Sequence, residues 1–140
     1  MKQEYRIEDG KDPENIIKLL DEKIYAYNSN KINRHDGELF SKIVLDKNGN
    51  IIAGIAGWTW AGACEITFLW VSEEQRNNGI GKKLLLAAED EAKRKDCNII
   101  LLRSYSFQAP LFYEKNGYKV ESIIENFPNG YRYYILEKVI

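Results

Sequence analysis

The sequence is poor in cysteine, histidine and proline, and no charge sign dominates it. Among 140 residues there are two cysteines, Cys64 and Cys97, and one histidine, His35. Neither cysteine belongs to a Cys-x-x-Cys pair and no second histidine exists, so the sequence contains no zinc pattern and predicts no metal. Two free thiols without a disulfide framework are typical of the reducing cytoplasm, where we expect the protein.

Charge and hydropathy argue against two further classes of partner. The chain has 20 Lys and Arg residues and 21 Asp and Glu residues, a formal net charge of −1. Because basic residues are not in excess, we do not expect a nucleic-acid partner. No apolar run approaches the ~20 residues of a transmembrane helix. The N-terminus, Met1–Arg6, is too polar for a signal peptide. We therefore expect no membrane partner, and the length predicts one domain over residues 1–140.

The first part of the chain predicts one strand and one clear helix. Residues 3–8 have the pattern of a short strand. Asp12-Pro13-Glu14 predicts a helix start, with Asp as the N-cap and Pro at the first helical position. Apolar residues follow at helical spacing as far as Tyr27. The polar segment 28–36 breaks that pattern and predicts a loop or a ragged second helix.

From residue 39 onward the pattern predicts a three-strand meander and then alternating helices and strands. The third strand, 64–71, is almost continuously apolar and is therefore expected in the middle of the sheet. This order predicts an α/β (α+β) fold with a mixed, mostly antiparallel central sheet flanked by helices. The strands are predicted at 39–45, 51–60, 64–71, 98–102, 118–125 and 131–138, and the helices at 79–95 and 109–115.

The turn between the third strand and the long helix has the composition of an anion site. At Gly79-Ile80-Gly81 the glycines let backbone N–H groups approach a ligand, and a helix N-terminus favours phosphate. A P-loop does not fit, because Arg76 and Lys83 stand where it requires Gly and Ser or Thr. A dinucleotide fingerprint does not fit, because Leu84 replaces its third glycine. A nucleotide-binding phosphotransferase is therefore disfavoured.

The pattern that fits is Arg-x-x-Gly-x-Gly, from Arg76 to Gly81, which resembles the acetyl-CoA pyrophosphate loop of the GNAT superfamily. A second block, Ala109–Tyr118, resembles the A-x-x-F-Y-x-x-x-G-Y/F block of the same family. Both blocks stand in the family's order on the expected elements. The resemblance implies a single-domain GNAT fold. It also implies an N-acetyltransferase that moves acetyl from acetyl-CoA directly to a primary amine.

The resemblance also implies roles for individual residues. Tyr113 is the expected acid that protonates the departing thiolate, and Glu65 is the expected general base. With pKa values of ~10 for tyrosine and ~8.5 for a thiol, full proton transfer costs about 2 kcal/mol, so hydrogen-bond donation or late transfer is feasible. Because transfer is direct, Cys64 and Cys97 are not expected to carry acetyl. The expected coenzyme A contacts are Leu69, Trp70, Val71, Arg76, Asn77, Asn78, Gly79, Ile80, Gly81, Lys82, Phe107, Ala109 and Phe112.

The sequence does not choose the acceptor, which could be a small metabolite, a polyamine, an amino-sugar drug or a protein amine. By resemblance its site involves Asn28–Glu38 and Asn126–Tyr131, where the carboxylates of Asp36, Glu38 and Glu125 would suit a cation. Dimers are common in the family, so a homodimer is compatible with the resemblance.

Less specific readings of the same residues stay open. Tyr113 could be a core tyrosine, and Glu65 could be an ion-pair partner. Trp58 and Trp60 share one strand face, where they could pack or wall the acceptor pocket. The alternative function is a non-catalytic acyl-CoA-binding regulatory module of the same fold.

Overall fold

The computed structural model describes residues 3–140, and the chain divides by its contacts into two compact units, Met1–His35 and Asp36–Ile140. In the first unit, residues 3–10 have no regular secondary structure, so the strand predicted at 3–8 is wrong. A strand needs a neighbouring strand for its backbone hydrogen bonds, and the described part of this unit contains only a helix. The prediction of one domain over residues 1–140 stays a prediction.

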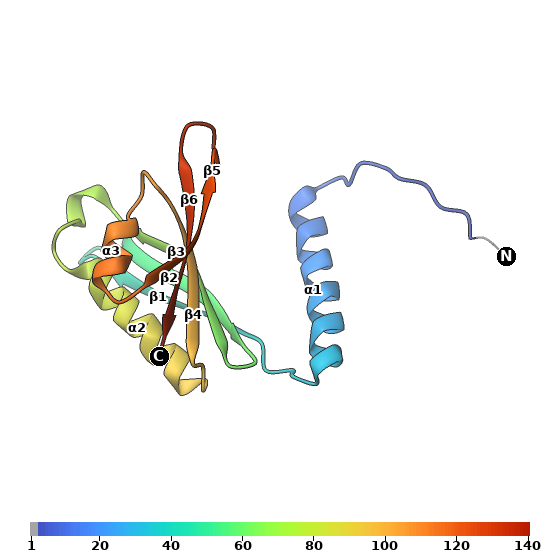
Figure 1. Ribbon diagram of the computed structural model, residues 1–140, viewed down its shortest axis with the longest axis horizontal. Coiled ribbons are helices and arrows are strands. Elements are labelled where there is room, and N and C mark those ends of the chain that lie inside the picture. The colour runs from blue at the N-terminus through green and yellow to red at the C-terminus, as the bar shows by residue number, and fades with distance from the viewer. Residues whose placement is uncertain (1–2) are drawn as a thin grey trace. The chain divides into compact units, whose positions relative to one another are not determined.

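The helix of the first unit, α1, spans Pro13–Ile32 (Figure 1). It begins as predicted, with Asp12 at the N-cap and proline in the first turn. It continues through much of the segment 28–36, which was predicted as a loop or second helix. There the Ser29 hydroxyl donates to the backbone carbonyl four residues earlier, so a polar residue fits the helix. Asn33 ends the helix in the left-handed conformation, with φ of 55°.

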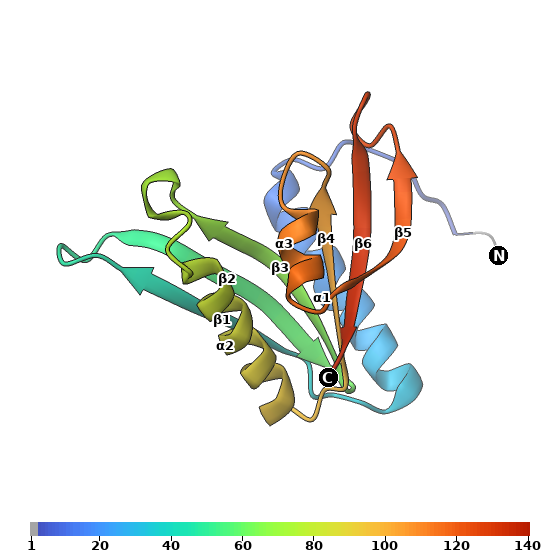
Figure 2. The same ribbon diagram turned by 60° about the vertical axis from the view of Figure 1, so that its left-hand side comes forward.

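The second unit is built on a six-stranded sheet in the order β1-β2-β3-β4-β6-β5 (Figure 2). All neighbouring strands are antiparallel except β3 and β4, which are parallel. β3 lies inside the sheet, as its apolar sequence predicted, and the predicted mixed fold is confirmed. The strands are β1 Glu38–Leu45, β2 Ile51–Trp60, β3 Ala63–Val71, β4 Ile99–Tyr105, β5 Lys119–Glu125 and β6 Arg132–Val139.

Two helices pack on one face of this sheet, and a short 3-10 helix, η1 (Glu73–Gln75), follows β3. α2 (Ile80–Arg94) contacts β1, β2 and β3, and α3 (Pro110–Lys115) contacts β5. α2 presents its apolar side to alternate residues of the strands. The buried core contains Ala53, Ile55, Cys64, Ile66, Leu84, Leu85, Ala88, Ala92, Ile100, Leu102, Tyr113, Tyr118 and Leu136.

β4 is longer than its sequence suggested. The predicted strand ended at Leu102, whereas Arg103, Ser104 and Tyr105 each pair with a residue of β6. The charged Arg103 interrupts the apolar run, but its side chain lies on the less buried face of the sheet, so it does not end the strand. The extra residues carry β4 past the end of its pairing with β3.

β3 contains a bulge where that pairing stops. Its register with β2 passes from Ala56–Phe68 to Gly57–Ile66, so Thr67 is an extra residue on β3. The parallel pairing with β4 ends at Ile66, which faces Leu102. Beyond these residues the two strands diverge (Figure 2).

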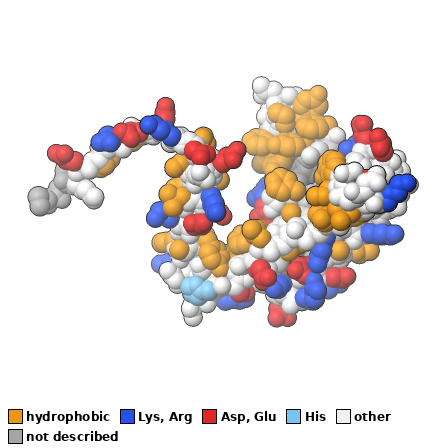
Figure 3. Space-filling model, turned by 180° about the vertical axis from the view of Figure 1, so that it is seen from behind, with side chains coloured by type: hydrophobic (Ala, Val, Ile, Leu, Met, Phe, Trp, Pro, Cys, Tyr) orange, Lys and Arg blue, Asp and Glu red, His pale blue; other side chains and the backbone are white. Residues whose placement is uncertain are grey.

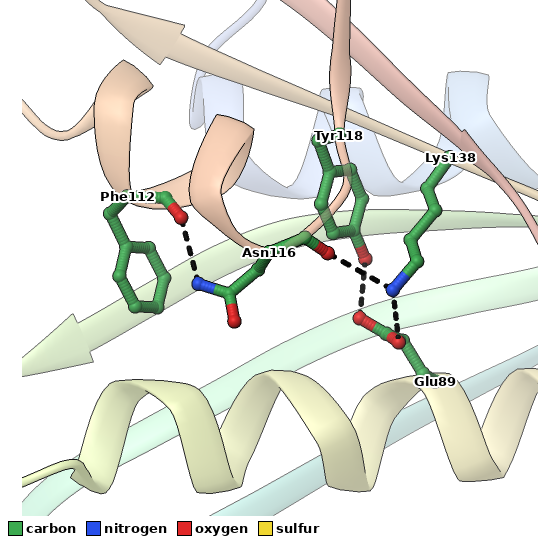
Figure 4. Close-up of polar contacts among 5 residues, drawn as sticks. All are labelled: Glu89, Phe112, Asn116, Tyr118 and Lys138. Carbon is green, nitrogen blue, oxygen red and sulfur yellow. Dashed lines mark hydrogen bonds and ion pairs between the residues drawn. The ribbon is translucent and has the colours of Figure 1, made fainter.

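A buried polar network connects α2 to β6 and to the loop after α3 (Figure 4). The Glu89 carboxylate accepts a hydrogen bond from the Tyr118 hydroxyl at 3.1 Å and pairs with Lys138 Nζ at 2.8 Å. Lys138 also donates to the backbone carbonyl of Asn116 at 3.0 Å. Burial, and then the charge of Glu89, raise the pKa of the Tyr118 phenol, which therefore stays a donor. The network joins α2, β6 and the loop after α3.

Gly57 is the residue whose replacement tests the bulge. In Gly57→Ala the new methyl group would lie 2.2 Å from the backbone oxygen of Glu65, so β2 or β3 must shift. We expect the free energy of unfolding in urea to fall by about 3 kcal/mol, the upper part of the range for overpacked sites. In the control Gly54→Ala the nearest atom is 3.3 Å away, and the expected loss is below about 1 kcal/mol. Equal losses in the two variants would contradict the close approach at Gly57.

Candidate active site

A cleft of about 780 Å³ opens where β3 and β4 separate. It is lined by the two diverging strands, the turn after β3, the start of α2 and the segment around α3. A volume of this size is typical of small-molecule and cofactor sites. The cleft thus brings together the two sequence blocks that were singled out as motifs.

The cleft contains most of the predicted site residues. Tyr113 lines it, whereas Asn78 and Glu65 are not among its lining residues. The other predicted residues that line it are Leu69, Trp70, Val71, Arg76, Asn77, Gly79, Ile80, Gly81, Lys82, Phe107, Ala109 and Phe112.

The turn between β3 and α2 exposes backbone N–H groups. Asn77 and Gly79 are in the left-handed conformation, with φ of 67° and 76°, and such turns form concave anion sites. Nothing lies within 4 Å of the position that a Cβ of Gly79 would occupy, so this position faces open space. The first N–H groups of α2 have no partner within the helix, and Lys82 adds a cation beside them. The turn therefore has the geometry and charge of a phosphate site.

The turn is fixed on both sides. Arg76 Nε donates to the backbone carbonyl of Val71 at 3.1 Å, which closes the turn back onto β3. A Cβ on Gly81 would lie 3.4 Å from the Phe112 ring, so α3 packs closely on the first turn of α2.

Tyr113 is held rigidly at the inner wall of the cleft. Its side chain is 9% exposed and makes edge contacts with the rings of Phe112 and Tyr118, with ring centroids 5.2 and 6.0 Å apart. Burial raises the pKa of Tyr113 above its ordinary value, so the phenol keeps its proton at neutral pH. The arrangement offers a hydrogen-bond donor to a ligand in the cleft.

Glu65 lies beside the cleft rather than in its lining. Its register partners, Trp58 on β2 and Leu101 on β4, place it on the face opposite the helices. Its carboxylate pairs with the guanidinium of Arg103, which does line the cleft. The ion pair that the sequence left open for Glu65 is therefore present, and its role as a base stays a prediction.

Sequence reasoning missed five polar residues of the cleft: Thr67, Gln75, Arg103, Ser104 and Gln108. Arg103 and Ser104 were overlooked because β4 was predicted to end at Leu102. No local signal showed that the strand continues, because the sequence Leu102-Arg103-Ser104-Tyr105 does not alternate between apolar and polar residues.

Other polar groups that could have formed a site have partners in the fold. Glu38 pairs with Lys95, and Glu125 pairs with Arg132 at 3.1 Å. Asp36 accepts a hydrogen bond from the backbone N–H of Ala61 at 3.2 Å. Over residues 3–140, no group of three or more His, Cys, Asp or Glu side chains could hold a metal ion. Likewise, no helix in the described chain has the length and apolar character needed to cross a membrane.

Comparison with known proteins agrees with this geometry. The chain is 29% identical over 105 residues to a blasticidin-S acetyltransferase of Streptomyces morookaense, an alignment that covers 72% of this chain and 75% of that protein. A crystal structure of an acetyltransferase from Bacillus cereus superposes with a TM-score of 0.81 at 35% identity, covering 97% of this chain and 98% of that one. The PaiA N-acetyltransferase of Thermoplasma acidophilum, solved with coenzyme A, superposes with a TM-score of 0.62 at 28% identity, covering 74% and 62%.

The family model described as the acetyltransferase (GNAT) family matches residues 4–118. This span includes the turn before α2 and the block that carries Tyr113. The named relatives are acetyltransferases. The chain belongs to the acetyltransferase (GNAT) family and is an acyltransferase enzyme.

Proposed function

We propose that this protein transfers the acetyl group of acetyl-CoA directly to a primary amine. The observation that carries the proposal is the single cleft that joins the anion-binding turn before α2 to the buried hydroxyl of Tyr113. Family membership, and the coenzyme A bound in the related PaiA structure, support acetyl-CoA as the donor.

The turn from Arg76 to Lys82 is the proposed site of the diphosphate. Its N–H groups, the positive end of α2 and the Lys82 ammonium all favour a dianion. The pantetheine arm then follows β3, whose edge toward β4 has no partner strand beyond Ile66. Unpaired backbone groups need hydrogen bonds, and the amides of the arm supply them. One N–H on this edge polarises the thioester carbonyl, the kind of preorganised donor that contributes most to acyl transfer.

The proposed reaction is a direct transfer and requires no covalent enzyme intermediate. The deprotonated amine nitrogen attacks the thioester carbon, a C–N bond forms, and the C–S bond breaks with its electron pair on sulfur. Tyr113 donates a proton to the thiolate and recovers one from solvent. Glu65, held by Arg103 at the edge of the cleft, takes the surplus proton of the amine through water.

The raised pKa of Tyr113 decides when its proton moves. Transfer to a free thiolate is uphill already at ordinary pKa values, by about 2 kcal/mol, and burial makes it more so. Tyr113 therefore stabilises the departing sulfur by a hydrogen bond, and the proton follows late.

The two cysteines are placed away from this chemistry. Cys64 and Cys97 are 2% and 6% exposed, and neither lines the cleft. Burial raises the pKa of Cys64 to about 12. Because the thiolate is the nucleophile, a thiol with this pKa is a poor acyl acceptor, which supports direct transfer.

Tyr113→Phe tests the proposed acid. We expect turnover to fall by at least about tenfold, and toward the ~10²–10⁴-fold typical of a lost general acid, while acetyl-CoA affinity stays similar. Release of free thiol measures turnover, and calorimetry measures affinity. Tyr134→Phe is the matched control, because it removes the hydroxyl of a partly buried tyrosine that does not line the cleft. Unchanged turnover in Tyr113→Phe would remove the residue from this role.

Gly79→Asp tests the diphosphate site, and Gly79→Asn is its control. Both side chains enter open space, and both residue types tolerate positive φ, so the pair differs in charge alone. We expect Asp to weaken coenzyme A binding by tenfold or more relative to Asn. Like charges ~4 Å apart repel by about 4 kcal/mol near a protein surface. Equal affinities by calorimetry would mean that the diphosphate binds elsewhere. If the unsubstituted protein binds acetyl-CoA but acetylates no amine, the non-catalytic acyl-CoA-binding module is the better description.

Thiol chemistry tests direct transfer. A shift of the pKa from 9.0 to about 12 lowers the thiolate fraction of Cys64 at pH 8 by roughly a thousandfold. Because folding raises the pKa of Cys64, its thiol stays protonated and unreactive until the pH approaches about 12. We expect Ellman's reagent to leave the folded protein unreacted at pH 8 and to modify both thiols in urea. Mass spectrometry after incubation with acetyl-CoA alone should find no acetylated cysteine, and a stable acetyl-cysteine would contradict direct transfer.

A further inference from the structure

Five aromatic side chains gather beside the cleft, where β4 ends and the β5–β6 hairpin turns; we call them the aromatic cluster. Figure 3 shows hydrophobic side chains gathered over the end of the sheet that carries this hairpin. The rings contact one another in a chain, at centroid distances between 4.7 and 6.5 Å. The members are Tyr105, Phe107, Phe127, Tyr131 and Tyr133.

The cluster is exposed, although its backbone is firmly held. Phe107, Phe127 and Tyr131 are 59%, 49% and 52% exposed. The loops that carry them are tied together by Ser106 and Arg132, which exchange hydrogen bonds of 2.8 and 3.1 Å. A contiguous apolar patch on a rigid support marks a binding surface more often than a packing defect.

The cluster is continuous with the cleft. Phe107 belongs to both, and it stacks on Tyr105 with ring centroids 5.2 Å apart and planes 3° apart. Tyr133 also contacts Tyr105, with ring centroids 4.7 Å apart. Arg103, which pairs with Glu65, lies two residues before Tyr105 on β4 and therefore on the same face of the sheet. The aromatic surface therefore extends from the cleft to the proposed base.

The charges around the cluster do not favour a polycation. The Glu65 carboxylate is paired with Arg103 and that of Glu125 with Arg132, so each carboxylate is already neutralised. Aromatic faces stack on planar rings and attract a single cation weakly. The surface thus selects a ring with one amine over a chain of amines.

We propose that the acceptor is an amine that carries a planar aromatic ring, and that the aromatic cluster binds this ring while the amine reaches the thioester. This proposal rests on the proposed acetyl transfer. It narrows the acceptor from any primary amine to an arylalkylamine. The ring would stack on the exposed faces of the cluster, and its short alkyl arm would enter the cleft past Phe107.

A matched pair of acceptors tests the proposal. 2-Phenylethylamine and 2-cyclohexylethylamine have the same carbon skeleton and charge, but only the first has a π-system. We expect kcat/KM to be about tenfold higher for 2-phenylethylamine, the ratio that favourable aromatic contacts produce, and higher again than for spermidine. Equal values for the two rings, or a preference for spermidine, would overturn the proposal and leave acetyl transfer intact.

Two substitutions in the hairpin assign the effect to the cluster. Tyr131→Leu and Phe127→Leu should each raise KM for 2-phenylethylamine several-fold, with little change for 2-cyclohexylethylamine or for acetyl-CoA. Tyr131→Phe keeps the ring and should keep the preference. A preference that survives both leucine variants would place the ring elsewhere and overturn the proposal.

Binding separates this proposal from the proposed function. If no amine is acetylated, the proposed function is wrong. Calorimetric titration of the two ring amines into the coenzyme A complex then still measures whether the protein binds the aromatic ring more tightly. Tighter binding of 2-phenylethylamine that Tyr131→Leu abolishes would support the ring site. Equal or absent binding would overturn it.

Discussion

The end of the β3–β4 pairing is the constraint on which the cleft depends. Two parallel strands that stay paired leave no space between them, whereas here the pairing stops at Ile66 and Leu102. The extra residue Thr67 bends β3 away, and Gly57 allows β2 to approach the bent strand. Backbone groups on the freed edge still need hydrogen bonds. The fold thus creates a slot lined by unpaired amides, which suits a ligand that is itself rich in amides.

The buried network of Glu89, Tyr118 and Lys138 keeps the walls of this slot in place. It connects α2, whose first turn forms the proposed anion site, to β6 and to the loop after α3. Replacing a buried ion pair with apolar residues is often neutral for stability, so the network is not an argument for stability alone. Its directional hydrogen bonds do fix how α2 and α3 sit relative to each other. That relation sets the position of Tyr113 against the turn at Gly79.

The proposed direct transfer requires two ligands to meet in one place, and the second unit has two surfaces of different chemistry that could each bind one of them. The turn before α2 presents N–H groups and Lys82 to a dianion. The end of β4 and the β5–β6 hairpin present aromatic faces. Both surfaces reach the cleft, so a bound donor and a bound acceptor would be held within reach of each other, which removes most of the entropic cost of their encounter.

The sequence by itself determined the elements and the motif positions of the second unit. Strand and helix periods, the Asn48-Gly49 turn and the glycines of the proposed anion site are local signals, since φ preferences and side-chain alternation act over a few residues. The same signals failed at residues 3–8, where alternation had no neighbouring strand to pair with. They also predicted an end of β4 at Leu102, because the charged Arg103 follows the apolar run. Only its pairing with β6 shows that the strand continues.

Only the tertiary structure decided the rest. The partner of Glu65, the bulge opposite Gly57 and the burial of Glu89 depend on register between segments far apart in the chain. The aromatic cluster likewise joins residues that β4 and the β5–β6 hairpin bring together. Such contacts depend on which strand lies beside which, and one strand's own pattern is compatible with many neighbours.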